Sequence, residues 1–154
     1  MRGLQILIAI GVFSTALFAA DSPFLGTWKL NPAKSKSTPG TALKEMTVKF
    51  EKDGEHIKRT ATGVDSDGNA VSQMATVPWD GKEHKIDAPG GPAITVAVKP
   101  KNDHSLDVTV RADGKVVSSG GLVVSKDGKT MTGTAKGEDQ KGRKMDNVEV
   151  YEKQ

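Results

Sequence analysis

The 154-residue chain contains no cysteine, and this absence excludes several classes of protein at once. Without thiols there are no disulfide bonds, no thiol nucleophile and no zinc or iron–sulfur site with cysteine ligands. Aromatic residues are also few, at 5% of the chain. The folded protein must therefore depend on its own hydrophobic core, without covalent cross-links.

Patterns that indicate catalysis or metal binding are missing as well. The histidines, His56, His84 and His104, show none of the i, i+2 or i, i+4 spacings of a local metal site. The sequence has no Gly-x-Ser-x-Gly nucleophile motif and no phosphate-binding glycine loop. We therefore predict no catalytic residues, no metal ion and no cofactor, and we do not expect an enzyme.

Charge is nearly balanced and widely spread. The chain has 22 lysines and arginines against 19 acidic residues, with no basic block. A nucleic-acid-binding surface usually concentrates basic residues and interleaves aromatic ones. The sequence shows neither feature, so we expect no nucleic-acid partner.

The N-terminus carries a long apolar segment. The first 20 residues have no acidic residue, a positive charge at Arg2 and an apolar run from Leu4 through Phe18, followed by Ala19 and Ala20. This order is typical of a secretory signal peptide. A membrane anchor is disfavoured because the run is short, contains polar residues and is followed by no basic cluster. We predict a signal peptide over 1–20 and one domain over 21–154, secreted or periplasmic, without a stable membrane anchor.

Cleavage is expected after Ala19 or Ala20, because small residues mark the exit of a signal peptide. N-terminal sequencing of the exported protein checks this expectation. A mature chain that still begins at Met1 would contradict it.

Turn signals divide the rest of the chain into short strands. The dipeptide Asp-Gly, which suits tight hairpin turns, starts at residues 53, 67, 80, 113 and 127. Further turns are predicted at 89–92 and 100–103, and an exposed loop at 31–43. Between the turns, apolar and polar residues alternate with period two, as in antiparallel strands with one wet face. The pattern predicts about ten strands, at 24–30, 45–52, 56–64, 70–77, 84–88, 93–99, 105–112, 115–125, 129–136 and 144–153.

A meander of this length must cover its edge strands, and closure into a barrel does so most completely. The predicted fold is therefore all-β, an antiparallel up-and-down meander closed into a barrel. Small inward residues, such as Ala61, Ala75 and Gly133, fit either a cavity or a flattened barrel.

Two short motifs resemble the calycin superfamily, which contains the lipocalin and fatty-acid-binding barrels. Residues 24–30 (Phe-Leu-Gly-Thr-Trp-Lys-Leu) resemble the first strand, and 150–153 (Val-Tyr-Glu-Lys) resemble the last strand of a fatty-acid-binding protein. The resemblance implies that Gly26 allows close strand approach and that Trp28 plugs the barrel floor. It makes Arg143 and Lys153 candidates for a cation–π contact with that tryptophan. The alternative is a core tryptophan in an unrelated β-sandwich.

The chain also departs from that family. Loop 31–43 is too short for the family's two-helix lid. Glu149 occupies the position, two residues before the last-strand tyrosine, where the family has an arginine that holds the lipid carboxylate. A carboxylate there would repel a fatty acid, so the family's substrate does not carry over.

Four residues are predicted to form an inward polar cluster that binds the ligand. Period two carries Arg59 inward with Ile57 and Ala61, and likewise carries Gln73 inward. The resemblance places Tyr151 inward, and Glu149 with it. We predict that Glu149 or an anionic ligand meets the charge of Arg59. In the open alternative, both charged residues reach water at strand ends, and Val148 and Val150 form the core face.

These features favour an exported barrel that binds a small, partly apolar or amphipathic ligand. The alternative is a structural or protein-interaction barrel of the cell envelope that binds no ligand. An interior cavity would favour the first function, and a collapsed core the second.

Overall fold

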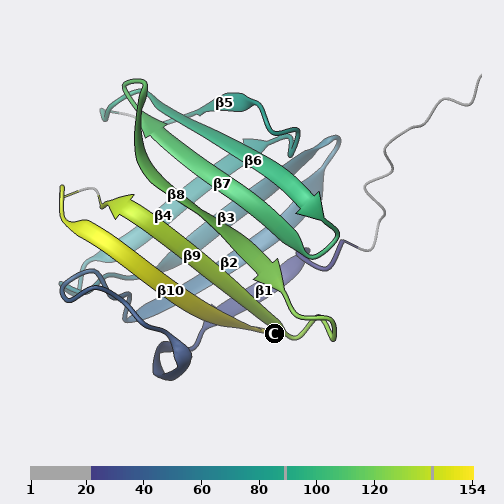
Figure 1. Cartoon of the computed structure of the whole chain (residues 1–154), viewed down its shortest axis with the longest axis horizontal. Coiled ribbons are helices and arrows are strands. Elements are labelled where there is room, and N and C mark those ends of the chain that lie inside the picture. Colours follow the sequence, from purple (N-terminus) through teal and green to yellow (C-terminus); the bar gives the residue numbers. More distant parts are fainter. Residues whose placement is uncertain (1–21, 89, 140) are drawn as a thin grey trace, which may run out of the picture.

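The computed structural model describes residues 22–88, 90–139 and 141–154; the predicted signal peptide lies outside the described residues. Ten antiparallel strands form one sheet in the order β4-β3-β2-β1-β10-β9-β8-β7-β6-β5 (Figure 1). Except for β4 and β5, strands that are consecutive in the chain pair with each other, and the first strand pairs with the last. Strands β4 and β5 are not paired, so the barrel is nearly closed, with one seam.

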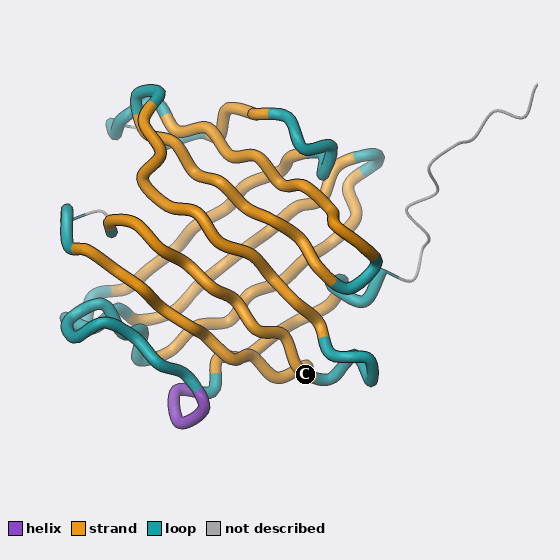
Figure 2. The backbone as a smooth tube through the Cα atoms, viewed as in Figure 1, coloured by secondary structure: helices purple, strands orange, loops and turns teal. Residues whose placement is uncertain are grey.

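The strand bounds agree closely with the sequence prediction. The strands are β1 (Gly26–Leu30), β2 (Glu45–Asp53), β3 (His56–Val64), β4 (Ala70–Val77), β5 (Glu83–Ile86), β6 (Ile94–Asn102), β7 (Ser105–Ala112), β8 (Lys115–Val124), β9 (Thr130–Glu138) and β10 (Lys144–Lys153). The predicted all-β, antiparallel meander is confirmed. Strands β6–β10 form the near layer and β1–β4 the far layer, and the two directions cross (Figures 1 and 2).

The β6–β7 turn begins later than the predicted position at 100–103. Strand β6 continues through Asn102, and Pro100 pairs with Leu106. Proline has no N–H to donate to a strand ladder, so it is tolerated in sheets mainly at edges and bulges. A register irregularity between Pro100 and Asn102 provides such a site.

The segment 31–43 is largely exposed, as its composition predicts, but it is also hydrogen-bonded along β10. After a short 3-10 helix η1 (Pro32–Lys34), Lys36 forms a bridge with Val148 of β10. Strand β1 is only five residues long, so it leaves part of the β10 edge without a strand partner. The segment supplies hydrogen bonds along that edge, and buried Thr41 donates to the Asn147 side chain at 3.0 Å.

Aromatic side chains seal one end of the barrel. Trp28 is 0% exposed, and its Nε1 donates to the carbonyl of Phe24 at 2.8 Å. Trp79 packs edge-on against Phe24 and Phe50, with ring centroids 5.5 and 5.9 Å apart. Lys153 Nζ lies 5.0 Å from the centre of the Trp28 ring, so the cation–π candidate at this position is confirmed.

Further apolar residues near the β2–β3, β6–β7 and β8–β9 turns complete this seal. They include Ile57, Val77, Val98, Leu106, Val124 and Met131, all of them buried. The hydrophobic core therefore gathers toward the sealed end.

Gly26 begins β1 in a conformation that other residues rarely adopt. Its φ angle is +116°, and a Cβ atom at this position would lie 3.1 Å from Cε of Lys153. Glycine is therefore favoured at this position for two reasons. The neighbouring strand lies close, as the resemblance implies, and the backbone φ angle is positive.

Replacing Trp28 by alanine should lower the free energy of unfolding by about 3–5 kcal/mol, because it empties the centre of the sealed end. Denaturant melts measure this loss. Lys29→Ala, on the exposed side of the same strand, is the matched control and should cost less than about 0.5 kcal/mol. Equal effects of the two substitutions would show that Trp28 does not hold the barrel together.

Candidate functional site

Strand register defines which side chains face the barrel interior. Residues paired directly across an antiparallel ladder point to the same face of the sheet. Buried Val48 pairs with Ala61, and Ala61 pairs with Gln73. In the next inward row, Phe50 pairs with Arg59. Both predicted polar residues of β3 and β4 therefore face inward.

The last strand presents its polar residues to the same interior. Tyr151 pairs with buried Leu30 on one side and with buried Met131 on the other. Glu149, two residues earlier, shares that face and pairs with Gly133. The alternative placement, with Val148 and Val150 on the core face, is therefore wrong.

Several of these inward residues remain accessible to water. Arg59 and Glu149 are partly exposed and Gln73 is exposed, although their register directs them away from the outer surface. Inward apolar residues of β7, such as Val108 and Val110, are also only partly buried. A side chain on the inner face is accessible only if water reaches it from within the barrel or through the seam. Water therefore reaches part of the inner face beyond the sealed end, from within the barrel or through the seam.

The cluster consists of two hydrogen-bonded pairs. Arg59 Nη1 donates to Gln73 Oε1 at 3.3 Å, between neighbouring strands. The Tyr151 hydroxyl donates to Glu149 Oε2 at 2.6 Å, within β10. Of the two partners predicted for Arg59, Glu149 does not contact it directly, because no ion pair within 4.0 Å involves Arg59 in the described part of the chain. Each charged group has a neutral partner close by instead.

The interior environment perturbs two of these groups. Burial raises the pKa of Tyr151 well above its usual value, and the nearby Glu149 carboxylate raises it further. Burial lowers the pKa of Arg59, an effect that Tyr151 and Glu149 oppose. Glu149 is therefore close enough to act on the guanidinium electrostatically without contacting it.

Gly133 makes room for the cluster on the neighbouring strand β9. A Cβ atom at this position would lie 3.2 Å from Leu122 Cδ2 and 4.0 Å from Tyr151 Cε2. The absence of a side chain therefore leaves space beside the Tyr151 ring. The alternation of the strand predicted that Gly133 faces inward, but it did not predict that Leu122 and Tyr151 lie beside it.

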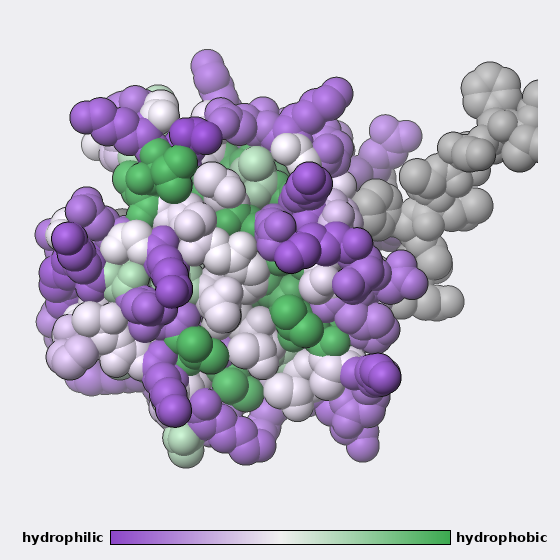
Figure 3. Space-filling model, in the orientation of Figure 1, coloured by the Kyte–Doolittle hydropathy of each residue, from purple (hydrophilic) through white to green (hydrophobic). Residues whose placement is uncertain are grey.

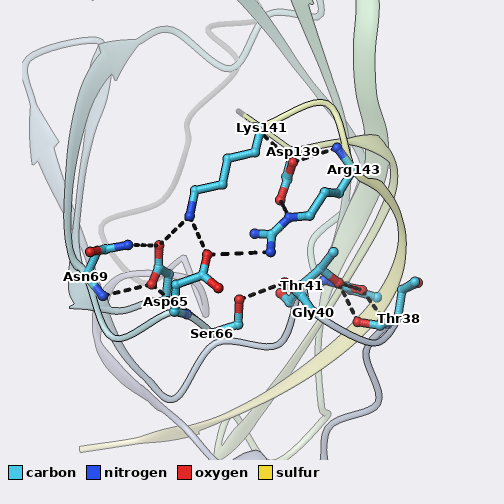
Figure 4. A network of polar contacts seen from close by, with 11 residues as sticks. Thr38, Gly40, Thr41, Asp65, Ser66, Asn69, Asp139, Lys141 and Arg143 are labelled. Atoms are coloured by element: carbon cyan, nitrogen blue, oxygen red, sulfur yellow. Dashed lines mark hydrogen bonds and ion pairs between the residues drawn. The ribbon is translucent and has the colours of Figure 1, made fainter.

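At the end opposite the seal, a polar network joins three connecting segments (Figure 4). Asp67 of the β3–β4 turn accepts from Lys141 and from Arg143 of the β9–β10 turn. Arg143 Nε also donates to Asp139 at 2.6 Å, so Arg143 is not the cation over Trp28. Ser66 Oγ donates to the carbonyl of Gly40 at 2.7 Å. No local sequence pattern predicted this network, because its members come from turns far apart in the chain.

Asn147 anchors the β1–β2 segment beside this network. Its Oδ1 accepts from the backbone N–H of Thr38 and from the hydroxyl of Thr41, both at 3.0 Å. The asparagine side chain is itself buried. The segment between β1 and β2 is therefore fixed along β10.

Two hollows mark the outer surface of the barrel. One, of about 520 Å³, lies beside β1, β2 and β3 and includes Lys29 and Lys44. The other, of about 460 Å³, lies over β7, β8 and β9, around Gly121 and the exposed Val123. The face formed by the near strands is weakly polar at its centre, with separate apolar groups (Figure 3). These hollows are distinct from the interior that holds the polar cluster.

The histidines occupy strand ends and turns, as predicted. His84 Nε2 lies 2.9 Å from Asp80, and His104 Nδ1 lies 3.2 Å from the carbonyl of Val124. Within 22–88, 90–139 and 141–154, no three His, Asp or Glu side chains are placed to hold a metal ion. The same ranges contain no helix with the length and apolar character needed to span a bilayer.

Solved structures show the same fold. A Schistosoma mansoni fatty acid binding protein, in complex with arachidonic acid, matches with a TM-score of 0.56 and 19% identity over 86% of this chain and 97% of that one. A zebrafish ileal bile acid-binding protein complexed with cholic acid matches with a TM-score of 0.53 and 15% identity, over 86% and 100%. As-p18, an extracellular fatty acid binding protein, gives a TM-score of 0.51 and 16% identity, over 86% and 97%.

No protein-family model and no curated protein matches the sequence. The structural matches establish the calycin-like barrel and confirm the predicted resemblance at the level of the fold. The β1–β2 connection is too short for the two-helix lid that the resemblance implies, as predicted. Its only helical element among the described residues is the three-residue η1.

Tyr151 is the only tyrosine of the chain, so its ionisation can be followed by ultraviolet absorbance. In the native protein, tyrosinate should form well above pH 10, the midpoint of an unperturbed tyrosine, whereas denaturant should restore a midpoint of about 10. Above that pH the unfolded chain releases a proton that the folded chain retains, so stability falls as pH rises.

Glu149→Gln should lower the native midpoint by removing one cause of the shift, while burial keeps it raised. Circular dichroism at each pH verifies that the protein is still folded. A native midpoint near 10 would contradict the buried environment assigned to Tyr151.

Proposed function

We propose that this protein binds a small, partly apolar ligand inside its barrel. The observation that supports this function is the inner face beyond the aromatic seal, where inward valines of β7 and the polar cluster are only partly buried. Binding pockets for small molecules are usually apolar with a few placed polar groups. Arg59, Gln73, Glu149 and Tyr151 are the proposed ligand-contacting polar groups.

The structural matches agree with this proposal. The Schistosoma mansoni and zebrafish proteins were solved with arachidonic acid and cholic acid, which are small and largely apolar. A barrel of the same fold with an accessible interior can enclose a molecule of similar character. Because the three matches described above are below 25% identity, the ligand class is argued from this chain's own residues.

We also propose that the domain is exported. The support is the leader-like composition of residues 1–20, together with a cysteine-free chain that needs no oxidative folding. An extracellular fatty acid binding protein with this fold shows that the scaffold is compatible with such a location.

A protein-interaction barrel is the second candidate. The outer surface offers Val116 and Val123, which are 51% and 52% exposed. These valines lie on β8, at its beginning and near its end, so they do not by themselves define a large apolar patch. The accessible interior favours ligand binding over this alternative.

An environment-sensitive apolar dye should bind saturably, with about one dye per protein. Ala75→Phe should abolish this binding, because Ala75 pairs with Arg59 on the inner face and a phenyl ring there would fill the interior. Met74→Phe, on the neighbouring position of the same strand, is the matched control. Met74 is 63% exposed on the outer face, so this substitution should leave binding within about twofold.

Fluorescence titration gives both affinities, and circular dichroism verifies that each variant is folded. Absence of saturable binding by the native protein would overturn the proposed function. Loss of binding in Met74→Phe with retention in Ala75→Phe would move the site to the outer surface.

A further inference from the structure

The polar cluster of the barrel interior contains one positive and one negative group. Arg59 and Glu149 face inward from β3 and β10, and both side chains are only partly buried. The other charged side chains that share this face belong to strand ends: Lys52, His84, Lys115 and Lys153. The charges that a ligand meets at the cluster therefore balance.

Each of the two charged groups keeps unused hydrogen-bonding capacity. Arg59 Nη1 donates to Gln73, but its other N–H groups have no acceptor within the described part of the chain. Glu149 Oε2 accepts from Tyr151, and Oε1 has no donor among the described residues. The cluster therefore presents charge-assisted donors and one charge-assisted acceptor to the same space.

A carboxylate ligand gains little from this arrangement. It is attracted by Arg59 and repelled by Glu149, and it loses its hydration on entering the barrel. An uncharged head that both accepts and donates avoids this conflict. Its oxygen can accept from the guanidinium while its O–H or N–H donates to the carboxylate.

We propose that the interior selects amphipathic ligands whose polar end is an uncharged donor and acceptor, such as a primary alcohol or amide, over carboxylates of the same chain length. This specificity rests on the proposed function, because it requires a ligand inside the barrel. Arg59 and Glu149 act as a matched pair, so removing either charge should shift the preference in opposite directions.

Displacement of the bound dye by decanol and by decanoate, at a pH where decanoate is ionised, tests the specificity. The readout is the ratio of the two affinities, compared between variants, because this comparison cancels the different solubilities of the competitors. Glu149→Gln leaves Arg59 unbalanced and should raise the affinity for decanoate relative to decanol by about tenfold or more. Arg59→Gln should shift the ratio the other way.

Glu152→Gln provides the matched control. Glu152 lies on the same strand but points outward, where it pairs with Lys34 at 2.8 Å. Its substitution removes the same charge from the protein without changing the interior. The affinity ratio should therefore stay within about twofold of the native value.

A second arm needs no variant. Decanamide, which donates and accepts, should displace the dye at least about tenfold more strongly than methyl decanoate, which only accepts. This arm applies even if Glu149→Gln or Arg59→Gln fails to fold.

The outcomes separate the two proposals. If no dye binds to the native protein, the proposed function fails. If the dye binds but neither decanol nor decanamide displaces it, or if Glu149→Gln leaves the affinity ratio unchanged, the specificity fails and the ligand-binding function stands. Stronger binding of decanoate than of decanol by the native protein would also overturn the specificity.

Discussion

Pairing of the first strand with the last is the constraint on which the rest of the barrel depends. Leu30 pairs with Tyr151 and Trp28 pairs with Lys153, while β1 also pairs with β2. This short ladder converts an open meander into a nearly closed barrel and places Trp28 at the centre of the sealed end. It also fixes the face of β10. A slip of one residue would turn Tyr151 and Glu149 outward, because alternate residues of a strand face opposite sides.

The two ends of the barrel are built differently, and the difference positions the candidate site. One end is closed by packed aromatic rings and buried aliphatic residues, which exclude water. The other end is held by ion pairs and hydrogen bonds between turns and by the contact of Thr41 with Asn147. The unpaired β4 and β5 leave a second interruption in the wall. An apolar floor, an accessible middle and a polar rim suit a molecule with one apolar and one polar end.

Much of this architecture could be read from local patterns. Alternation located the strands and their faces, and Asp-Gly marked turns, because both signals arise from neighbouring residues. The motif around Gly26 and Trp28 indicated the fold, since a positive φ and a buried plug impose strict local demands. Pro100 was misleading because the β6–β7 pair accommodates it beside a register irregularity, which depends on the partner strand.

The candidate site was only partly predictable. Period two predicted that Arg59 faces inward, and the resemblance placed Tyr151, and Glu149 with it, on the inner face. A face does not specify a distance, and the structure pairs Arg59 with Gln73 and Glu149 with Tyr151. The ordered β1–β2 segment was missed because its main anchor, Asn147, lies more than a hundred positions away in the sequence. Contacts of this kind depend on how distant elements meet, and no local pattern reports them.

The central claim is that the inner face of the barrel receives a ligand, and nuclear magnetic resonance tests it most directly. Backbone and side-chain shifts would be mapped while decanol is added to the folded protein. The account expects perturbations that alternate along β3, with Arg59 and Ala61 affected and outward Thr60 largely unaffected. Perturbations confined to outer positions of β7–β9, such as Val123, would contradict it.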